Sequence, residues 1–179
     1  MKQKDMSRRG RLRALTKAAM IAALYAGLTA LLAPISYGPT LQFRVAEALT
    51  ILPVFTASAV PGLAIGCALA NLYGMLGADP LGVVDIVVGT SATLLAALCT
   101  YRLRNIRAGG VPLAAFLSPV LWNALIVGAE LHFLVPAGGA FWLAALYVAA
   151  GELTVVAALG VPLFLLIQRT PVRGMLEDG

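Results

Sequence analysis

The stretch Arg8–Ala33, RRGRLRALTKAAMIAALYAGLTALLA, decides the fold, because a basic segment passes directly into an apolar one. The same contrast recurs along the chain. All but one of the 13 Lys and Arg residues lie in three short polar segments, which are Met1–Lys17, Arg102–Gly110 and Gln168–Arg173. Lys and Arg gather on the cytoplasmic flanks of membrane spans. The sequence therefore predicts a membrane protein with these three segments on its cytoplasmic side.

The composition agrees with this interpretation. Of the 179 residues, 60% are hydrophobic and 12% are charged, and the mean hydropathy is +0.91. A soluble domain has about a quarter of its residues charged, so lipid is the expected solvent. The net charge of +5 does not indicate nucleic-acid binding, because the excess lies in segments that flank membrane spans.

A helix needs roughly 17–25 residues to cross the hydrocarbon core of a bilayer. We predict a single all-α transmembrane domain, 1–179, with a basic segment at 1–13, a tail at 168–179 and both termini cytoplasmic. The N-terminus resembles a signal peptide, but we expect its apolar part to be retained as the first span. The six predicted spans are Ala14–Ala33, Val45–Val60, Pro61–Leu76, Val83–Tyr101, Val111–Leu131 and Phe141–Ile167.

The acidic residues of the apolar region cluster near the outer ends of these spans. Glu47, Asp79, Asp85 and Glu130 fall there, and Glu152 falls midway through the last span. A charged side chain at the bilayer centre costs roughly 2.5–3.5 kcal/mol, so such acids face a cavity, a partner or water. We therefore predict a pocket that opens to the outside of the membrane.

Several of these acids also have a purely structural interpretation. Arg44, the one cation outside the basic segments, lies three residues before Glu47, and the two side chains can pair on one helical turn. Asp79 lies in a Gly-Ala-Asp-Pro turn sequence. Asp85 can serve as an acid at the start of a helix. For Glu47 and Asp85 the choice between structure and ligand binding stays open.

The other polar candidates lie within spans or at their ends. Asn123 and Glu130 are seven residues apart, which places them on one helix face and favours a site over a helix–helix contact. Asn71 suits an interhelical hydrogen bond as well as it suits a binding site. Some aromatic residues suit the belt at the membrane surface, and His132 suits an outer loop. These aromatic residues are Tyr37, Trp122, Trp142 and Tyr147.

The sequence holds no constellation typical of an enzyme. It has no nucleophile with an evident base, no cluster of metal ligands and no phosphate-binding loop. Cys67 and Cys99 lie far apart in apolar spans, where we interpret them as small hydrophobic residues. We predict no catalytic residue, no metal and no cofactor, and any ATP hydrolysis would come from another chain.

Small residues recur every four positions in the first span, at Ala18, Ala22 and Ala26. Residues at this spacing form a flat strip against which another helix can pack closely. We expect this strip to dock a partner subunit in the membrane.

Three ungapped runs resemble one family. They are LAPISYGPTLQFRVAEALTILP at Leu32–Pro53, GLAIGCALANL at Gly62–Leu72 and LGVVDIVVGTSATLLA at Leu81–Ala96. They are similar to the queuosine-precursor transporter family QueT. These proteins are S components of energy-coupling factor (ECF) transporters in the cell membrane. The resemblance implies six helices, a micronutrient pocket facing outward, a membrane T component docked on the alanine strip, and two cytoplasmic ATPases.

The implied substrate is a 7-deazaguanine such as the 7-aminomethyl or 7-cyano base. Its N1–H and exocyclic amine suit one carboxylate, for which Glu130 is the first candidate and Glu47 the second. Its carbonyl needs a donor, which could be Gln42, Asn71, Asn123 or Arg44. Its ring needs an aromatic face, which could come from Tyr37, Phe43, Trp122 or Trp142. Two other functions stay open, an S component for another planar vitamin and a membrane scaffold without ligand; a small intramembrane enzyme is disfavoured. The candidate substrate-binding residues are Glu130, Glu47, Arg44, Gln42, Asn123, Asn71, Asp85, Tyr37, Trp122 and His132.

Overall fold

The computed structural model of the protein describes residues 2–36, 44–77, 81–135 and 140–177. Within these ranges every regular element is a helix, apart from an isolated bridge between Ala108 and Val111. The prediction of an all-α fold is therefore confirmed for these residues. In chain order the helices are α1 (Lys2–Leu31), α2 (Ala33–Ser36), the 3₁₀ helix η1 (Val45–Val54), α3 (Ala59–Gly77), α4 (Gly82–Leu103), α5 (Leu113–Leu134), α6 (Phe141–Val155), the π-helical turn η2 (Val156–Gly160), α7 (Val161–Arg169) and α8 (Val172–Leu176).

Five helices of the described chain are long and apolar enough to cross a membrane, and they correspond to the first and the last four predicted spans. The second predicted span, Val45–Val60, contains the shorter apolar helix η1 and the first two residues of α3. Because a 3₁₀ helix rises about 2.0 Å per residue, its ten residues cover about 20 Å. The hydrocarbon core is about 30 Å thick. Helix η1 therefore covers part of the hydrocarbon core, and it does so with fewer residues than an α-helix of the same length would need.

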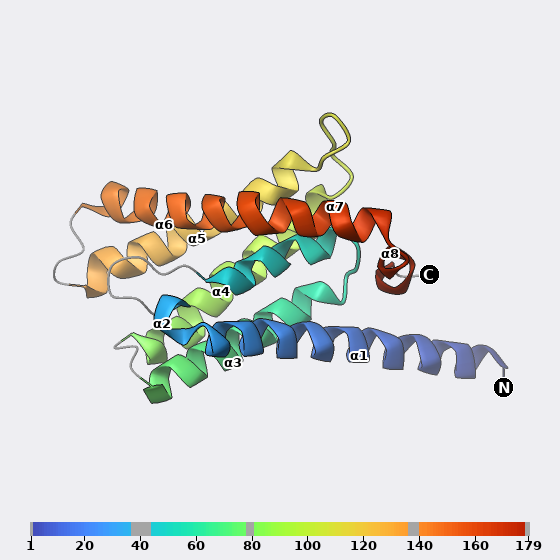
Figure 1. The fold of residues 1–179 in the computed structure, drawn as a ribbon. Coiled ribbons are helices and arrows are strands. Elements are labelled where there is room, and N and C mark those ends of the chain that lie inside the picture. Colours follow the sequence, from blue (N-terminus) through green and yellow to red (C-terminus); the bar gives the residue numbers. More distant parts are fainter. Residues whose placement is uncertain (1, 37–43, 78–80, 136–139, 178–179) are drawn as a thin grey trace.

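Helix η1 occupies the centre of the bundle. Nine of its ten residues are buried, and it contacts α1, α3, α4, α5, α6, α7 and η2. In Figure 1 it lies between α1 and the rod formed by α6 and α7. A helix that is apolar on nearly all sides belongs in such a core. Pro53 lies inside it and cannot donate a backbone hydrogen bond.

Neighbouring helices approach closely where one of them carries glycine. A Cβ atom added at Gly66 of α3 would lie 2.8 Å from the Tyr25 Cβ and 2.9 Å from the Ala22 backbone oxygen of α1. One added at Gly128 of α5 would lie 2.8 Å from the Ala145 Cα of α6. Small residues at helix contacts are the usual means of close packing in membranes. The two glycines thus bring α1 against α3 and α5 against α6.

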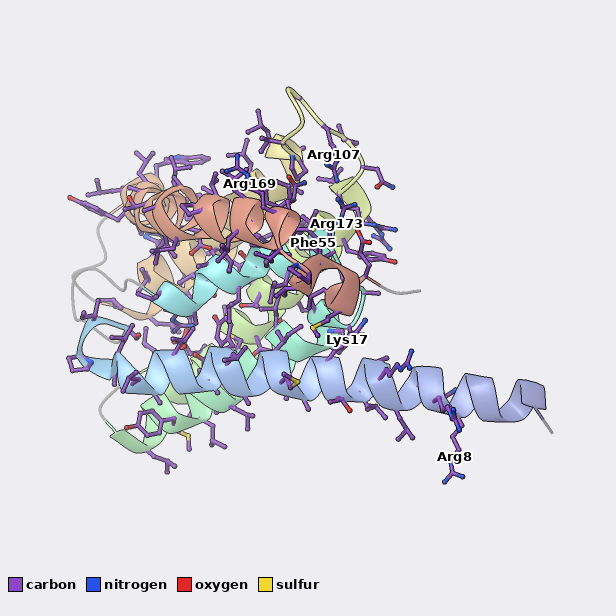
Figure 2. All side chains as sticks on the ribbon, turned by 45° about the vertical axis from the view of Figure 1, so that its right-hand side comes forward. Arg8, Lys17, Phe55, Arg107, Arg169 and Arg173 are labelled. Carbon is purple, nitrogen blue, oxygen red and sulfur yellow. The ribbon has the colours of Figure 1, made fainter. Side chains whose placement is uncertain are left out.

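Both ends of the described chain lie at the same end of the bundle (Figure 1). The Lys17 ammonium donates hydrogen bonds to the Leu176 and Glu177 carbonyl oxygens, at 2.9 and 3.2 Å, and so fixes α8 against α1. Arg107 and Arg173 lie toward this end as well (Figure 2). We call it the basic end. The far end, where α1 terminates and α4 and α6 begin, carries Arg44.

Candidate functional site

Seven polar side chains from six helices or their ends meet inside the apolar bundle. Two of them, Tyr25 and Asn71, have no exposed surface, and Glu47 has 3%. Burial of a polar or charged group is costly unless other groups compensate it. Such a gathering inside a membrane protein therefore marks the candidate site. The polar cluster, as we name it, consists of Tyr25, Arg44, Glu47, Asn71, Asp85, Asn123 and Glu152.

Arg44 anchors one side of the polar cluster. Its Nη2 atom lies 2.7 Å from the Asp85 Oδ2 of α4 in a nearly buried ion pair. The Asn71 side-chain amide of α3 donates a 2.6 Å hydrogen bond to the Asp85 backbone oxygen. Gly89 leaves space for this arrangement, because a Cβ there would lie 3.1 Å from the Asn71 Nδ2. Asp85 is thus the ion-pair partner of Arg44, a role that the local spacing had suggested for Glu47.

Glu47 occupies the middle of the polar cluster. The Tyr25 hydroxyl of α1 donates a short hydrogen bond to its Oε1 atom. The side chains of Asn123 on α5 and Glu152 on α6 also lie beside the Glu47 carboxylate and interact with it. Cys67 of α3 also lies next to Tyr25 and Glu47. Glu47 is therefore the point at which α1, η1, α5 and α6 meet.

Three acceptor atoms in the polar cluster are buried and accept no hydrogen bond from the described residues. They are Glu47 Oε2, Asn71 Oδ1 and Glu152 Oε1. A buried acceptor without a donor costs about 1–3 kcal/mol. The arrangement is therefore suited to a ligand that supplies several N–H donors.

The remaining predicted site residues are placed in different ways. Glu130 is buried on the same face of α5 as Asn123, and seven residues of helix separate them by about 10 Å along the axis. His132 is half-buried, and its ring contacts those of Phe133 and Phe141, with centroids 4.8 and 6.4 Å away. The predicted residues Tyr37, Gln42, Phe43 and Asp79 lie outside the described residues.

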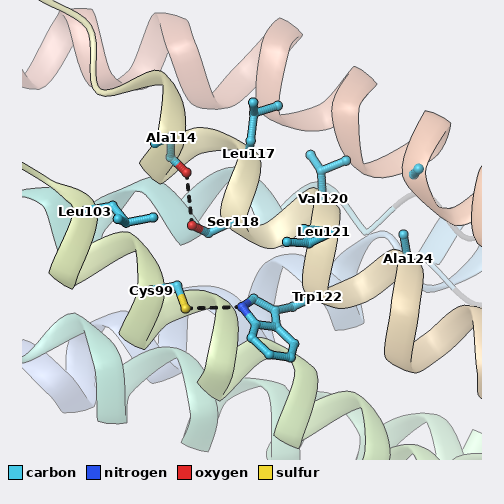
Figure 3. A pocket seen from close by; sticks show the side chains of 10 residues that line it. Cys99, Leu103, Ala114, Leu117, Ser118, Val120, Leu121, Trp122 and Ala124 are labelled. Carbon is cyan, nitrogen blue, oxygen red and sulfur yellow. Dashed lines mark hydrogen bonds between the residues drawn. The ribbon is translucent and has the colours of Figure 1, made fainter. Parts of the chain in front are cut away.

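Trp122 is not part of the polar cluster. It lines an apolar groove of about 550 Å³ beside α4 and α5, together with residues such as Leu103 and Leu117. Its indole nitrogen donates to the Cys99 sulfur at 3.2 Å (Figure 3). Trp142 is 71% exposed. The structure therefore brings neither tryptophan to the buried acids.

The alanine strip predicted to dock a partner is partly used within the chain. Ala18 and Ala22 are buried, and the backbone at each lies against Gly62 and Gly66 of α3, respectively. Ala26 is half-buried. The exposed small residues of α1 form a neighbouring strip, in which each residue directly follows a member of the predicted strip in the sequence. This exposed strip consists of Ala19, Ala23 and Gly27.

Two members of the polar cluster, Glu152 and Tyr25, were not predicted as site residues. Glu152 was noticed as an acid in mid-span but was not assigned to the site. Tyr25 was not noticed, although it continues the buried face of Ala18 and Ala22 at helical spacing. A hydroxyl on that otherwise apolar face was the signal available in the sequence.

Charged and hydrogen-bonding residues buried in an apolar helical bundle are a common feature of membrane transport proteins, where they mark substrate or ion pathways. The chain belongs to the QueT transporter family, whose model matches residues 15–169. The match extends from the first membrane helix to the end of α7, and it confirms the resemblance noted in the sequence. No curated protein and no solved structure matches the chain.

Proposed function

We propose that this chain is the substrate-binding S component of an ECF transporter and imports a 7-deazaguanine precursor of queuosine. The observation that carries the proposal is the set of unpaired buried acceptors in the polar cluster. A 7-deazaguanine is flat and neutral or cationic, and it offers N–H donors at its guanine-like edge. Its chemistry therefore complements a site rich in acceptors, and membership of the QueT transporter family supports a transport role.

The proposed orientation places the basic end in the cytoplasm and the far end outside the cell. The chain then crosses the plasma membrane six times, with η1 and the residues after it as the short second crossing. The enrichment of Lys and Arg at the basic end supports this orientation. Arg44, Asp85 and Glu130 then lie nearer the outer surface, from which the substrate enters.

Two groups of residues share recognition of the substrate in this proposal. Glu130 accepts the N1–H and the exocyclic amine of the base in a bidentate, charge-assisted contact, with Glu47 as the second candidate. Asn123 and Asn71 carry amides that can donate to the ring carbonyl. Gln42 and Tyr37 remain proposed contacts from the first outer loop.

We further propose that the exposed strip Ala19, Ala23 and Gly27 docks the membrane T component. Its residues are small and exposed, and the large side chains Met20 and Leu24 beside them are 62% and 54% exposed. A helix of the T component can approach such a face closely. Two cytoplasmic ATPases bound to the T component would supply the energy for release of the substrate.

The test is a calorimetric titration of the purified full chain with 7-aminomethyl- and 7-cyano-7-deazaguanine, with guanine as control. We expect at least one deazaguanine to bind, more tightly than guanine. Failure of the folded protein to bind either base would contradict the proposed substrate. Another planar micronutrient or a scaffold without ligand would then become the better hypothesis.

Glu130→Gln tests the proposed carboxylate. Loss of a charged, bidentate acceptor should weaken binding of the deazaguanine by about 10–100-fold. Glu177→Gln is the matched control, because it makes the same chemical change at a residue that forms an exposed ion pair with Arg173 near the chain end. Unchanged affinity in Glu130→Gln would show that this carboxylate does not hold the base.

A further inference from the structure

The polar cluster holds more negative than positive groups. Its carboxylates are those of Glu47, Asp85 and Glu152, and its one cation is Arg44. The Arg44 guanidinium lies 2.7 Å from Asp85, with only 11% of its side chain exposed. This ion pair balances one carboxylate and leaves the other two.

The rest of the apolar region cannot supply a second strong cation. Between Lys17 and Arg102 the only Lys or Arg is Arg44, and residues 108–168 contain none. Arg44 attracts Glu47 and Glu152 as well, but its single charge is already paired with Asp85, and the Asn123 amide beside the two acids carries no charge. Two neighbouring carboxylates at membrane depth are costly as free anions. Their charge must therefore be balanced by protons or by a bound cation.

The unpaired atoms of this site indicate which kind of cation fits. Glu47 Oε2 and Glu152 Oε1 are buried, with no hydrogen bond from the described residues. An ammonium group carries three N–H donors and one positive charge, so it can bind both oxygens and balance charge at once. A nitrile group can only accept hydrogen bonds, and its lone pair would face the carboxylate oxygens.

A separate, uncharged group also points to a ligand. Asn71 has no exposed surface, and its Oδ1 atom accepts no hydrogen bond from the described residues. It belongs to the same cluster, because its amide nitrogen lies 3.5 Å from the Cys67 sulfur, and Cys67 lies beside Tyr25 and Glu47. An amide oxygen left open in the same cluster suits a second donor of the same bound molecule.

Building on the proposed function, we infer that Glu47 and Glu152 form a subsite for the primary ammonium group of the substrate. The chain therefore selects the cationic 7-aminomethyl base over the neutral 7-cyano base. Glu130, about 10 Å further along α5 from Asn123, then holds the opposite, guanine-like edge. In this arrangement the two ends of the base are recognised by different carboxylates.

The test compares both bases on the same protein by calorimetric titration of the full chain in detergent. The wild-type protein should bind the 7-aminomethyl base at least tenfold more tightly than the 7-cyano base. Glu152→Gln keeps the size of the side chain but removes its charge. It should weaken binding of the 7-aminomethyl base at least tenfold, and change that of the 7-cyano base less than threefold.

Three further variants separate charge selection from damage to the fold. Glu47→Gln should lose selectivity as Glu152→Gln does, whereas Glu130→Gln should weaken both bases alike and keep their ratio. Glu177→Gln should leave both affinities and their ratio unchanged. Thermal unfolding of each variant identifies any that are misfolded. If one of the variants Glu47→Gln and Glu152→Gln is misfolded, the other alone suffices for the comparison.

The outcomes distinguish this inference from the proposed function. Equal binding of the two bases, or tighter binding of the 7-cyano base, would overturn the ammonium subsite and leave the proposed function intact. Retained selectivity in both folded variants, Glu47→Gln and Glu152→Gln, would overturn it as well. Binding of neither base by the folded wild type would overturn the proposed function and the inference together.

Discussion

Replacing Gly66 by alanine should push α1 away from α3. The added Cβ would lie 2.8 Å from the Tyr25 Cβ, 2.9 Å from the Ala22 backbone oxygen and 3.0 Å from the Ala22 Cα. Rotation of a side chain cannot relieve these contacts, because the neighbouring atoms are backbone or are attached directly to it. The two helices must therefore move apart, and the Tyr25 hydroxyl moves with α1 relative to Glu47.

The size of the effect follows from two opposing contributions. Alanine in a helix interior is about 1 kcal/mol more favourable than glycine. Overpacking of a tight contact costs about 1–3 kcal/mol. Since the contacts at Gly66 involve backbone, we expect the upper part of that range and a net loss of about 2 kcal/mol in the free energy of unfolding.

Gly27→Ala is the matched control, because no atom lies within 4 Å of a Cβ built there. This variant should gain about 1 kcal/mol, so the two variants should differ by about 3 kcal/mol. For a chain of this size that corresponds to roughly 6–12 °C in Tm. A thiol-reactive dye can follow unfolding in detergent, since Cys67 is completely buried in the native fold. Equal Tm values for the two variants would refute the close contact between α1 and α3.

Two further predictions follow from other contacts. Asp85→Asn removes the carboxylate that pairs with the buried Arg44 guanidinium. It should lower the free energy of unfolding by about 3 kcal/mol, measured by thermal unfolding. The double variant Arg44→Gln/Asp85→Asn should recover part of that loss, and no recovery would argue against the pair. Ala23→Leu should reduce the amount of T component that co-purifies with the chain, measured with the T component expressed alongside it, and should leave ligand affinity unchanged. Ala14→Leu, on the opposite side of α1 by helical spacing, is the control for that variant, and an equal effect of both would exclude the exposed strip as the docking face.

The arrangement of the ends was predictable because charge patterning acts over whole segments. The three basic segments indicated that both termini lie together, and the hydrogen bonds from Lys17 to the carbonyl oxygens of Leu176 and Glu177 place α8 against α1. The five long helices were predictable for the same reason, since their apolar runs are long enough to be recognised individually. The 3₁₀ geometry of η1 was not predictable, because a window of hydropathy carries no information on rise per residue. Pro53 was its only local signal.

The site was predictable in its composition but not in its pairings. Glu47, Asn71, Asp85 and Asn123 were all candidates, and all four lie in the polar cluster. The ion pair of Arg44 joins residues 41 positions apart, whereas local reasoning favours a partner within one helical turn. The position of Trp122 outside the polar cluster was not predictable either. Both faces of a membrane helix are apolar, so hydropathy cannot tell which of them an aromatic residue occupies.

The contact between α1 and α8 has a consequence for how the chain can be rearranged. Because Lys17 hydrogen-bonds to Leu176 and Glu177, the first membrane helix and the end of the chain are neighbours in space. Gly109 and Gly110, with φ of +59° and +85°, form an exposed turn between α4 and α5. A circular permutant opened at this turn, with residue 177 joined by a linker to the start of α1, would interrupt no membrane helix. The order of the helices along the chain is therefore separable from their arrangement around η1.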